Sequence, residues 1–101
     1  MAEYIGSELK YKVVIAAAGF DIDRDDFQIE CICGSKKKLY QKKDILLDGQ
    51  GNYYLAVDTT GFKKGTLYAV TTMYIPDEDF PDGLRTEVDK QKLDDLWDVR
   101  K

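Results

Sequence analysis

Apolar and polar residues alternate in short runs along most of this chain. In the clearest run, Phe27, Ile29, Cys31 and Cys33 occupy every second position of residues 27–33. Successive side chains of a β-strand point to opposite faces of the sheet. This run therefore predicts a strand with one buried face and one face in contact with water.

Similar runs recur along the chain and predict a series of short strands. Residues 9–17 are apolar on both faces, which is typical of a central or sandwiched strand. Residues 43–47 fit either a helical turn or a short irregular strand. The other predicted strands cover residues 36–41, 53–58, 66–75 and 85–92.

The end of the chain has a different periodicity. Leu93, Leu96 and Trp97 follow the spacing i, i+3, i+4, at which side chains meet on one face of a helix. This spacing predicts one or two helical turns in a short C-terminal tail, with a frayed terminus as the alternative.

Turn-forming residues separate the predicted strands at intervals of about eight to twelve residues, and helical patterns are nearly absent. The chain is therefore expected to be all-β, an antiparallel β-sandwich of six to seven strands that forms a single domain over residues 1–101. The residues expected in its core are Val13, Ile15, Phe27, Ile29, Cys31, Leu55, Val57, Tyr68, Val70 and Val88.

The amino-acid composition limits the kinds of ligand and partner that the chain is expected to bind. The chain has no histidine and a net charge of −4. Without histidine it lacks the usual general base near neutral pH and the commonest metal ligand. A mildly acidic chain is not expected to bind nucleic acid, whose backbone requires clustered Lys and Arg. No apolar run approaches the roughly 20 residues needed to cross a bilayer, so no membrane partner is expected.

The two cysteines indicate the cellular compartment in which the chain is expected to be made. Cys31 and Cys33 fall on the same face of one predicted strand. A disulfide within one extended strand would be strained, so both are expected to be small reduced residues of the core. Reduced cysteines favour synthesis in the cytoplasm.

The loops between the predicted strands differ in charge. Residues 21–26, 48–51 and 76–83 carry carboxylates, whereas residues 34–38 and 61–65 are rich in lysine. If every connection reverses the chain, alternate loops lie at the same end of the molecule. We therefore expect an acidic pole and a basic pole, an arrangement suited to docking onto a protein partner.

The acidic loops also offer a candidate metal site. Asp21, Asp23 and Asp25 have the alternating spacing of oxygen ligands in a calcium loop, and a shared site would add Asp77 and Asp79 from the neighbouring loop. The alternative is a solvated turn whose carboxylates accept hydrogen bonds from backbone amides. No cofactor is expected unless calcium occupies this loop.

Four tyrosines form the second candidate site. Tyr53 and Tyr54 are adjacent, so their rings face opposite sides of a strand, and the exposed one would join Tyr40 or Tyr74 in an aromatic platform. Such a platform would bind a glycan or a protein. The alternative is packing of the rings across neighbouring strands. No recognisable pair of nucleophile and base is present, so no enzymatic activity is expected.

One segment resembles a known fold family. Residues 62–70, Phe-Lys-Lys-Gly-Thr-Leu-Tyr-Ala-Val, resemble the turn-into-strand signature of immunoglobulin-like and fibronectin type III domains. The resemblance implies an immunoglobulin-like sandwich in which Tyr68 packs at a corner and bonds back to the backbone. The Cys…Trp…Cys arrangement of immunoglobulin domains is missing, because the only tryptophan is Trp97.

A second resemblance bears on origin. Residues 18–27, 48–54 and 74–88 resemble small proteins of phages, prophages and other mobile elements of gut bacteria. The resemblance implies a component of a virion or appendage, made in the cytoplasm and associated with the virion. The expected function is a non-catalytic structural or assembly module that acts through protein contacts or self-association. The alternative is a glycan-binding module that uses exposed tyrosines and a calcium loop.

Overall fold

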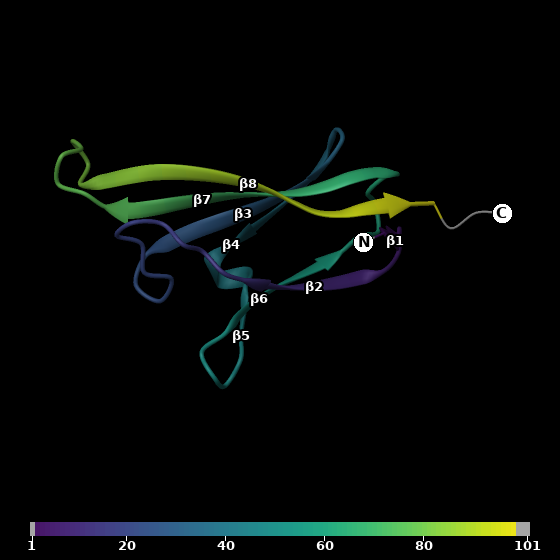
Figure 1. Ribbon diagram of the computed structural model, residues 1–101, viewed down its shortest axis with the longest axis horizontal. Coiled ribbons are helices and arrows are strands. Elements are labelled where there is room, and N and C mark those ends of the chain that lie inside the picture. The colour runs from purple at the N-terminus through teal and green to yellow at the C-terminus, as the bar shows by residue number, and fades with distance from the viewer. Residues whose placement is uncertain (1, 99–101) are drawn as a thin grey trace.

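The computed structural model describes residues 2–98 (Figure 1). Strands dominate this range, and its only helix is one 3-10 turn, so the all-β prediction is confirmed. The elements are β1 Ala2–Tyr4, β2 Glu8–Val13, β3 Asp26–Cys33, β4 Lys36–Gln41, η1 Lys42–Asp44, β5 Leu46–Leu47, β6 Tyr53–Asp58, β7 Gly65–Pro76 and β8 Leu84–Trp97.

The strands form two sheets. The larger sheet has the strand order β1-β8-β7-β3-β4, and the smaller one has the order β2-β6-β5. Paired strands within residues 2–98 run antiparallel except β1, which lies parallel to the end of β8. The long strands β7 and β8 run along most of the molecule (Figure 1).

The core lies between the two sheets and follows the alternation of the sequence. β3 buries Phe27, Ile29 and Cys31, and β6 buries Leu55 and Val57. These five core predictions are confirmed. Val13 and Ile15 are partly buried and pack against the same cluster. The other buried apolar residues are Cys33, Ile45, Tyr53, Phe62, Leu67, Ala69, Met73, Ile75 and Leu96.

Three core predictions are wrong because β7 and β8 present the opposite face. Leu67 and Ala69 turn inward, so the intervening Tyr68 and Val70 lie half-buried on the outer face. Val88 on β8 is 64% exposed on that same face. β7 carries apolar residues at both parities, and the alternation alone does not select the buried set.

The predicted central strand over residues 9–17 is an edge strand. β2 is the outermost strand of the smaller sheet, and its pairing with β6 ends at Val13. Residues 14–17 continue without strand pairing, with Val14 75% exposed and Ile15 turned inward. Residues 43–47, for which a helical turn and a short strand were the two alternatives, contain the end of η1 and then β5.

The predicted helical tail is the end of β8. Leu67 pairs with Asp94, whereas Tyr68 pairs with Lys92, so Leu93 is an extra residue in a β-bulge. The bulge shifts the alternation by one, and Asp94 and Leu96 beyond it are buried. The resulting spacing of Leu93 and Leu96 imitates that of a helix.

The hydrophobic pattern does not predict β1, and a buried threonine holds the turn that follows it. The side chain of Thr59 is fully buried at the end of β6. Its Oγ1 donates a hydrogen bond to the carbonyl of Ser7 at 2.7 Å and accepts one from the N–H of Gly6 at 2.9 Å. These two bonds join the smaller sheet to the turn that leads from β1 into β2.

Candidate functional site

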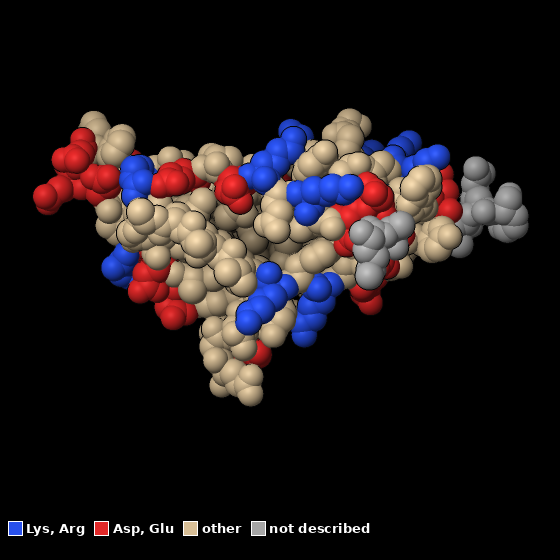
Figure 2. Space-filling model, viewed as in Figure 1, with Lys and Arg blue, Asp and Glu red and all other residues tan. Residues whose placement is uncertain are grey.

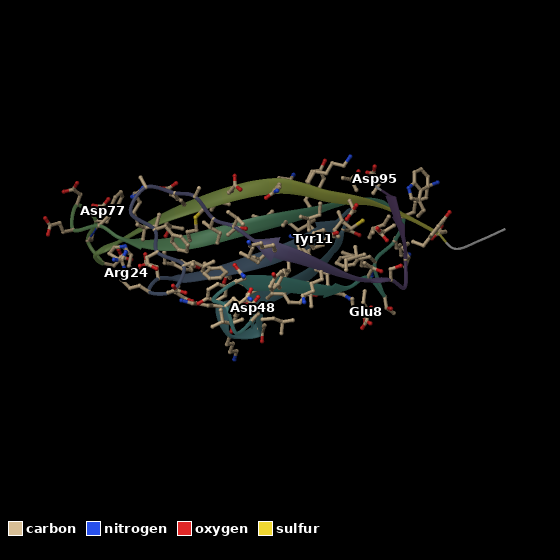
Figure 3. The ribbon with its side chains drawn as sticks, turned by 60° about the horizontal axis from the view of Figure 1, so that its bottom comes forward. Glu8, Tyr11, Arg24, Asp48, Asp77 and Asp95 are labelled. Atoms are coloured by element: carbon tan, nitrogen blue, oxygen red, sulfur yellow. The ribbon has the colours of Figure 1, made fainter. Side chains whose placement is uncertain are left out.

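Two of the three carboxylate-bearing loops lie together at one end of the molecule, as alternation predicts. Residues 14–25 enter β3 at the same end at which β7 leaves the larger sheet, because Asp26 pairs with Tyr74. Figure 3 shows Arg24 and Asp77, one from each loop, at the same end of the molecule. Arg85 connects the two loops: its guanidinium donates to Asp77 Oδ2 at 3.2 Å and to the carbonyl of Ala18 at 2.9 Å.

The carboxylates of residues 21–25 are occupied within their own turn. Asp21 Oδ1 accepts a hydrogen bond from the N–H of Asp23 at 2.9 Å. Asp25 is 5% exposed, and its oxygens accept hydrogen bonds from the Arg24 guanidinium at 2.7 and 2.9 Å and from the Asp21 N–H at 2.9 Å. The hydrogen bonds from Arg24 are the main cause that lowers the pKa of Asp25 to about 2.

The carboxylates of Asp23 and Asp77, two further proposed calcium ligands, also accept hydrogen bonds from the protein. Asp23 Oδ1 accepts a hydrogen bond from the Tyr53 hydroxyl at 2.9 Å, and Asp77 Oδ1 accepts one from the N–H of Asp79 at 3.0 Å. Lys42 Nζ donates to the carbonyl of Asp25 at 2.8 Å, which adds a positive charge to the loop.

These contacts correspond to the alternative interpretation, a turn whose carboxylates accept bonds from its own amides. Within residues 2–98 there is no group of three or more acidic or cysteine residues arranged to hold a metal ion. The geometry therefore does not bring the five aspartates together as a set of ligands.

The end of the molecule expected to be basic carries charges of both signs. The lysine loops lie opposite the acidic loops, because the β3–β4 turn is next to Leu67 at the start of β7. Glu8 and Asp95, however, also lie at that end (Figure 3). Figure 2 shows acidic side chains gathered at the left end and both charges mixed near the right end.

The third acidic loop lies apart from the other two. The turn with Asp48 projects from the smaller sheet, away from Arg24 and Asp77 (Figures 1 and 3). Asp48 Oδ1 accepts hydrogen bonds from the N–H groups of Gln50 at 2.8 Å and Asn52 at 2.9 Å. Its carboxylate therefore shapes the turn rather than joining an acidic pole.

The four tyrosines do not form an aromatic platform. Tyr53 is 9% exposed, and its ring packs edge-on against Phe27 with the centroids 6.4 Å apart. Tyr54 lies on the outer face of the smaller sheet, half-buried. Tyr40 pairs with Ile29 and packs against the core, whereas Tyr74 lies on the outer face of the larger sheet.

Tyr68 does not occupy the corner that its resemblance implies. Its half-buried ring lies on the outer face of the larger sheet, where Lys90 Nζ is 4.4 Å from the ring centroid. A lysine at this distance is within range of a cation–π interaction. The contact positions a positive charge above the sheet instead of closing a corner.

The outer face of the larger sheet carries an exposed surface with an ordered charge pattern. One row across four strands reads Leu39, Glu30, Val70, Lys90. Leu39 is 50% exposed and Val88, in an adjoining row, is 64% exposed. Below, the outer face denotes the central part of this surface, which comprises Glu30, Ile32, Leu39, Tyr68, Val70, Thr72, Val88 and Lys90.

The sequence itself contains a signal for the outer face, beside the acidic loops and the tyrosines. In β3, the residues between the buried apolar positions include Glu30 and Ile32, so its exposed side is not uniformly polar. β7 likewise carries Tyr68 and Val70 between buried residues. β3 and β7 therefore place apolar side chains on both faces of the larger sheet.

Comparisons with known proteins found no match to this chain. No protein-family model, no curated protein and no solved structure matches it. Among residues 2–98 no helix has the length and apolar character required to cross a membrane.

Proposed function

We propose that this chain is a non-catalytic structural or assembly module that associates with a second copy of itself through the outer face. The observation that carries the proposal is the row in which Glu30 and Lys90 flank Val70. Neighbouring strands are about 5 Å apart, so the two opposite charges lie at nearly equal distances from the central strand β7.

This row is complementary to itself under two-fold symmetry. A two-fold axis parallel to β7 and above Val70 places Glu30 of one copy opposite Lys90 of the other, and the reverse. The same operation brings the two Tyr68 rings together at the centre. The flanking apolar residues Leu39 and Val88 then add buried area at the sides, where isolated exposure in water is unfavourable.

The strand order supports an immunoglobulin-like topology for the module. In immunoglobulin sandwiches of the variable type, strands G, F, C and C′ share one sheet and strands B, E and D lie in the other. The orders β8-β7-β3-β4 and β2-β6-β5 follow that arrangement. The chain departs from it in lacking a buried tryptophan on the strand equivalent to C, where Cys31 is buried instead.

A phage-like setting is part of the proposal and rests on the resemblance of residues 18–27, 48–54 and 74–88 to proteins of mobile elements. Virions and appendages are built from repeated copies, so a self-complementary face suits a component of one. The glycan-binding alternative has less support, because the tyrosines proposed for it lie on different surfaces.

Charge exchange across the outer face tests the proposal. Light scattering on a sizing column would measure mass over a wide concentration range for the original chain, Glu30→Lys, Lys90→Glu and the double variant. Each single change places like charges opposite each other, so we expect dimerisation to weaken at least tenfold. The double variant restores opposite charges and should recover the dimer.

Matched controls separate the face from a general effect of net charge. Glu8→Lys and Lys12→Glu make the same charge changes on β2, at exposed positions of the smaller sheet. Both controls should dimerise like the original chain. A strict monomer at every concentration, or equal losses in the controls and the outer-face variants, would overturn self-association through this face.

A further inference from the structure

A groove opens between the two sheets beside the free edge of β8. It encloses about 410 Å³ between β8 and the segment 13–17 that leaves β2. Its lining comes from both sheets and includes the apolar side chains of Ile29, Leu55 and Met73 beside polar ones. The groove lies on the inner side of the larger sheet, and of the outer-face residues Val88 alone contributes to its lining.

The β8 wall of the groove presents unpaired backbone groups. The N–H of Asp77 donates to the carbonyl of Gly83 at 2.9 Å, which fixes the phase of the antiparallel ladder between β7 and β8. Bonding alternates along such a ladder, so the N–H and C=O groups of Thr86, Val88 and Lys90 point away from β7. β1 covers the same edge only at Asp95–Trp97.

The opposite wall is also an unpaired stretch of backbone. Residues 14–17 lie outside the strands, and their exposure alternates as in a strand. Within residues 2–98, the N–H and C=O groups of Val14, Ile15 and Ala16 make no hydrogen bond to the protein. Two extended segments with free donors and acceptors thus face one cavity.

Side-chain contacts close the groove at both ends. At one end, Arg85 donates to the carbonyl of Ala18 at 2.9 Å. At the other, the hydroxyl of Tyr11 donates to the buried carboxylate of Asp94. The free edge from Thr86 to Lys92 spans about 20 Å at roughly 3.3 Å per residue, which is room for five to seven residues of extended chain.

The β8 side of the groove carries two carboxylates, whereas Lys12 lines the opposite side from β2. Glu87 and Asp89 line the groove from β8 and point to the same side of the strand. Glu87 is paired with Arg85, whereas Asp89 is exposed to solvent. A cationic side chain with an aliphatic stem suits this arrangement, because the stem covers apolar surface while the charged head reaches the carboxylates.

We propose that this groove accepts an extended peptide segment of a partner protein, which pairs with the free edge of β8 and directs a Lys or Arg toward Glu87 and Asp89. Main-chain hydrogen bonds would supply affinity, and the two carboxylates would select the basic residue. The unpaired backbone on both walls favours a peptide strand over a compact cationic ligand, which would leave those groups without partners.

The test uses a blocked synthetic heptapeptide of alternating valine and arginine. Nuclear magnetic resonance would follow its titration into the Glu30→Lys variant, so that self-association through the outer face does not interfere. We expect shift changes at Thr86, Val88 and residues 14–16. Amide exchange at the edge of β8 should slow at least tenfold, because those N–H groups gain acceptors.

Two controls identify how the peptide binds. The same peptide with N-methyl groups on alternate residues lacks the donors for one edge and should not bind. Asp89→Asn removes one of the two carboxylate charges at an exposed position and should weaken binding of the arginine peptide several-fold, more so at low salt. An unmethylated heptapeptide with glutamate in place of arginine should bind more weakly than the arginine peptide.

Three results would overturn the proposal. One is the absence of shift changes at millimolar peptide. Another is a set of changes confined to the acidic loops or to the outer-face residues Glu30, Leu39 and Tyr68. The third is equal binding of the N-methylated and unmodified peptides, which would indicate attraction between charges without strand pairing. None of these bears on dimerisation, which the charge-exchange variants measure separately.

Discussion

Replacing Thr59 by valine should detach the turn between β1 and β2 while leaving the core packed. Valine has nearly the same shape as threonine, so the substitution creates little cavity at this fully buried position. It removes the donor to the Ser7 carbonyl and the acceptor of the Gly6 N–H. The loss therefore comes from two hydrogen bonds and not from apolar packing.

The expected loss is about 2 to 3 kcal/mol in the free energy of unfolding. Each bond contributes about 1 kcal/mol, and a buried group left unsatisfied costs somewhat more. The Ser7 carbonyl keeps a hydrogen bond from the N–H of Thr59 at 3.1 Å, and Gly6 is exposed to water. Neither group is therefore left without a hydrogen-bond partner. For a domain of this size the midpoint of thermal unfolding should fall by about 10 to 20 °C.

Urea unfolding measures this loss, with circular dichroism for the sheets and fluorescence of Trp97 for the neighbourhood of β1. Trp97 pairs with Tyr4 and is the only tryptophan, so its signal reports on this region. Thr86→Val is the matched control, because Thr86 is exposed on β8, and it should change stability by less than about 0.5 kcal/mol. A Thr59→Val loss no larger than that of the control would refute the assigned role of the hydroxyl.

Three further predictions concern buried polar groups. Asp25→Asn should destabilise the protein at neutral pH. The loss should shrink as pH falls from 3.8, the ordinary pKa of the carboxyl, through its folded pKa of about 2. Urea midpoints measured against pH test this, and a pH-independent difference would contradict it. Tyr11→Phe should lower the free energy of unfolding by about 1.5 to 3 kcal/mol, because the buried carboxylate of Asp94 loses a donor; an unchanged urea midpoint would refute it. Burial raises the pKa of the Cys31 thiol to about 11, so iodoacetamide at pH 8 should leave it unmodified in the folded protein and label it in urea, as mass spectrometry can verify.

The strand pattern was predictable wherever one face of a strand is clearly polar. β3 and β6 have that character, and their buried residues Phe27, Ile29, Cys31, Leu55 and Val57 follow from the alternation. β7 is apolar at both parities, so its buried side depends on which sheet covers it. That choice is made by tertiary packing and is absent from a local pattern.

The candidate sites were less predictable, because a list of residue types does not contain their partners. The aspartates of residues 21–25 have the spacing of metal ligands, but Arg24 and the local amides use their oxygens. The row of Glu30, Val70 and Lys90 joins three strands far apart in sequence. It becomes visible only when the register of all three pairings is known.

The bulge at Leu93 explains why the edge of β8 is covered in one part and open in the other. Before the bulge, Thr86, Val88 and Lys90 direct their backbone groups outward, whereas beyond it the Trp97 carbonyl does so and accepts the N–H of Ile5 at 2.9 Å. A strand in continuous register cannot match both phases, because the bulge shifts the ladder by one residue. β1 pairs only with the far part of the edge, so a strand that pairs with the near part would have to be a second, separate segment. This division is the physical reason to expect the partner of the groove to be a different stretch of chain from β1.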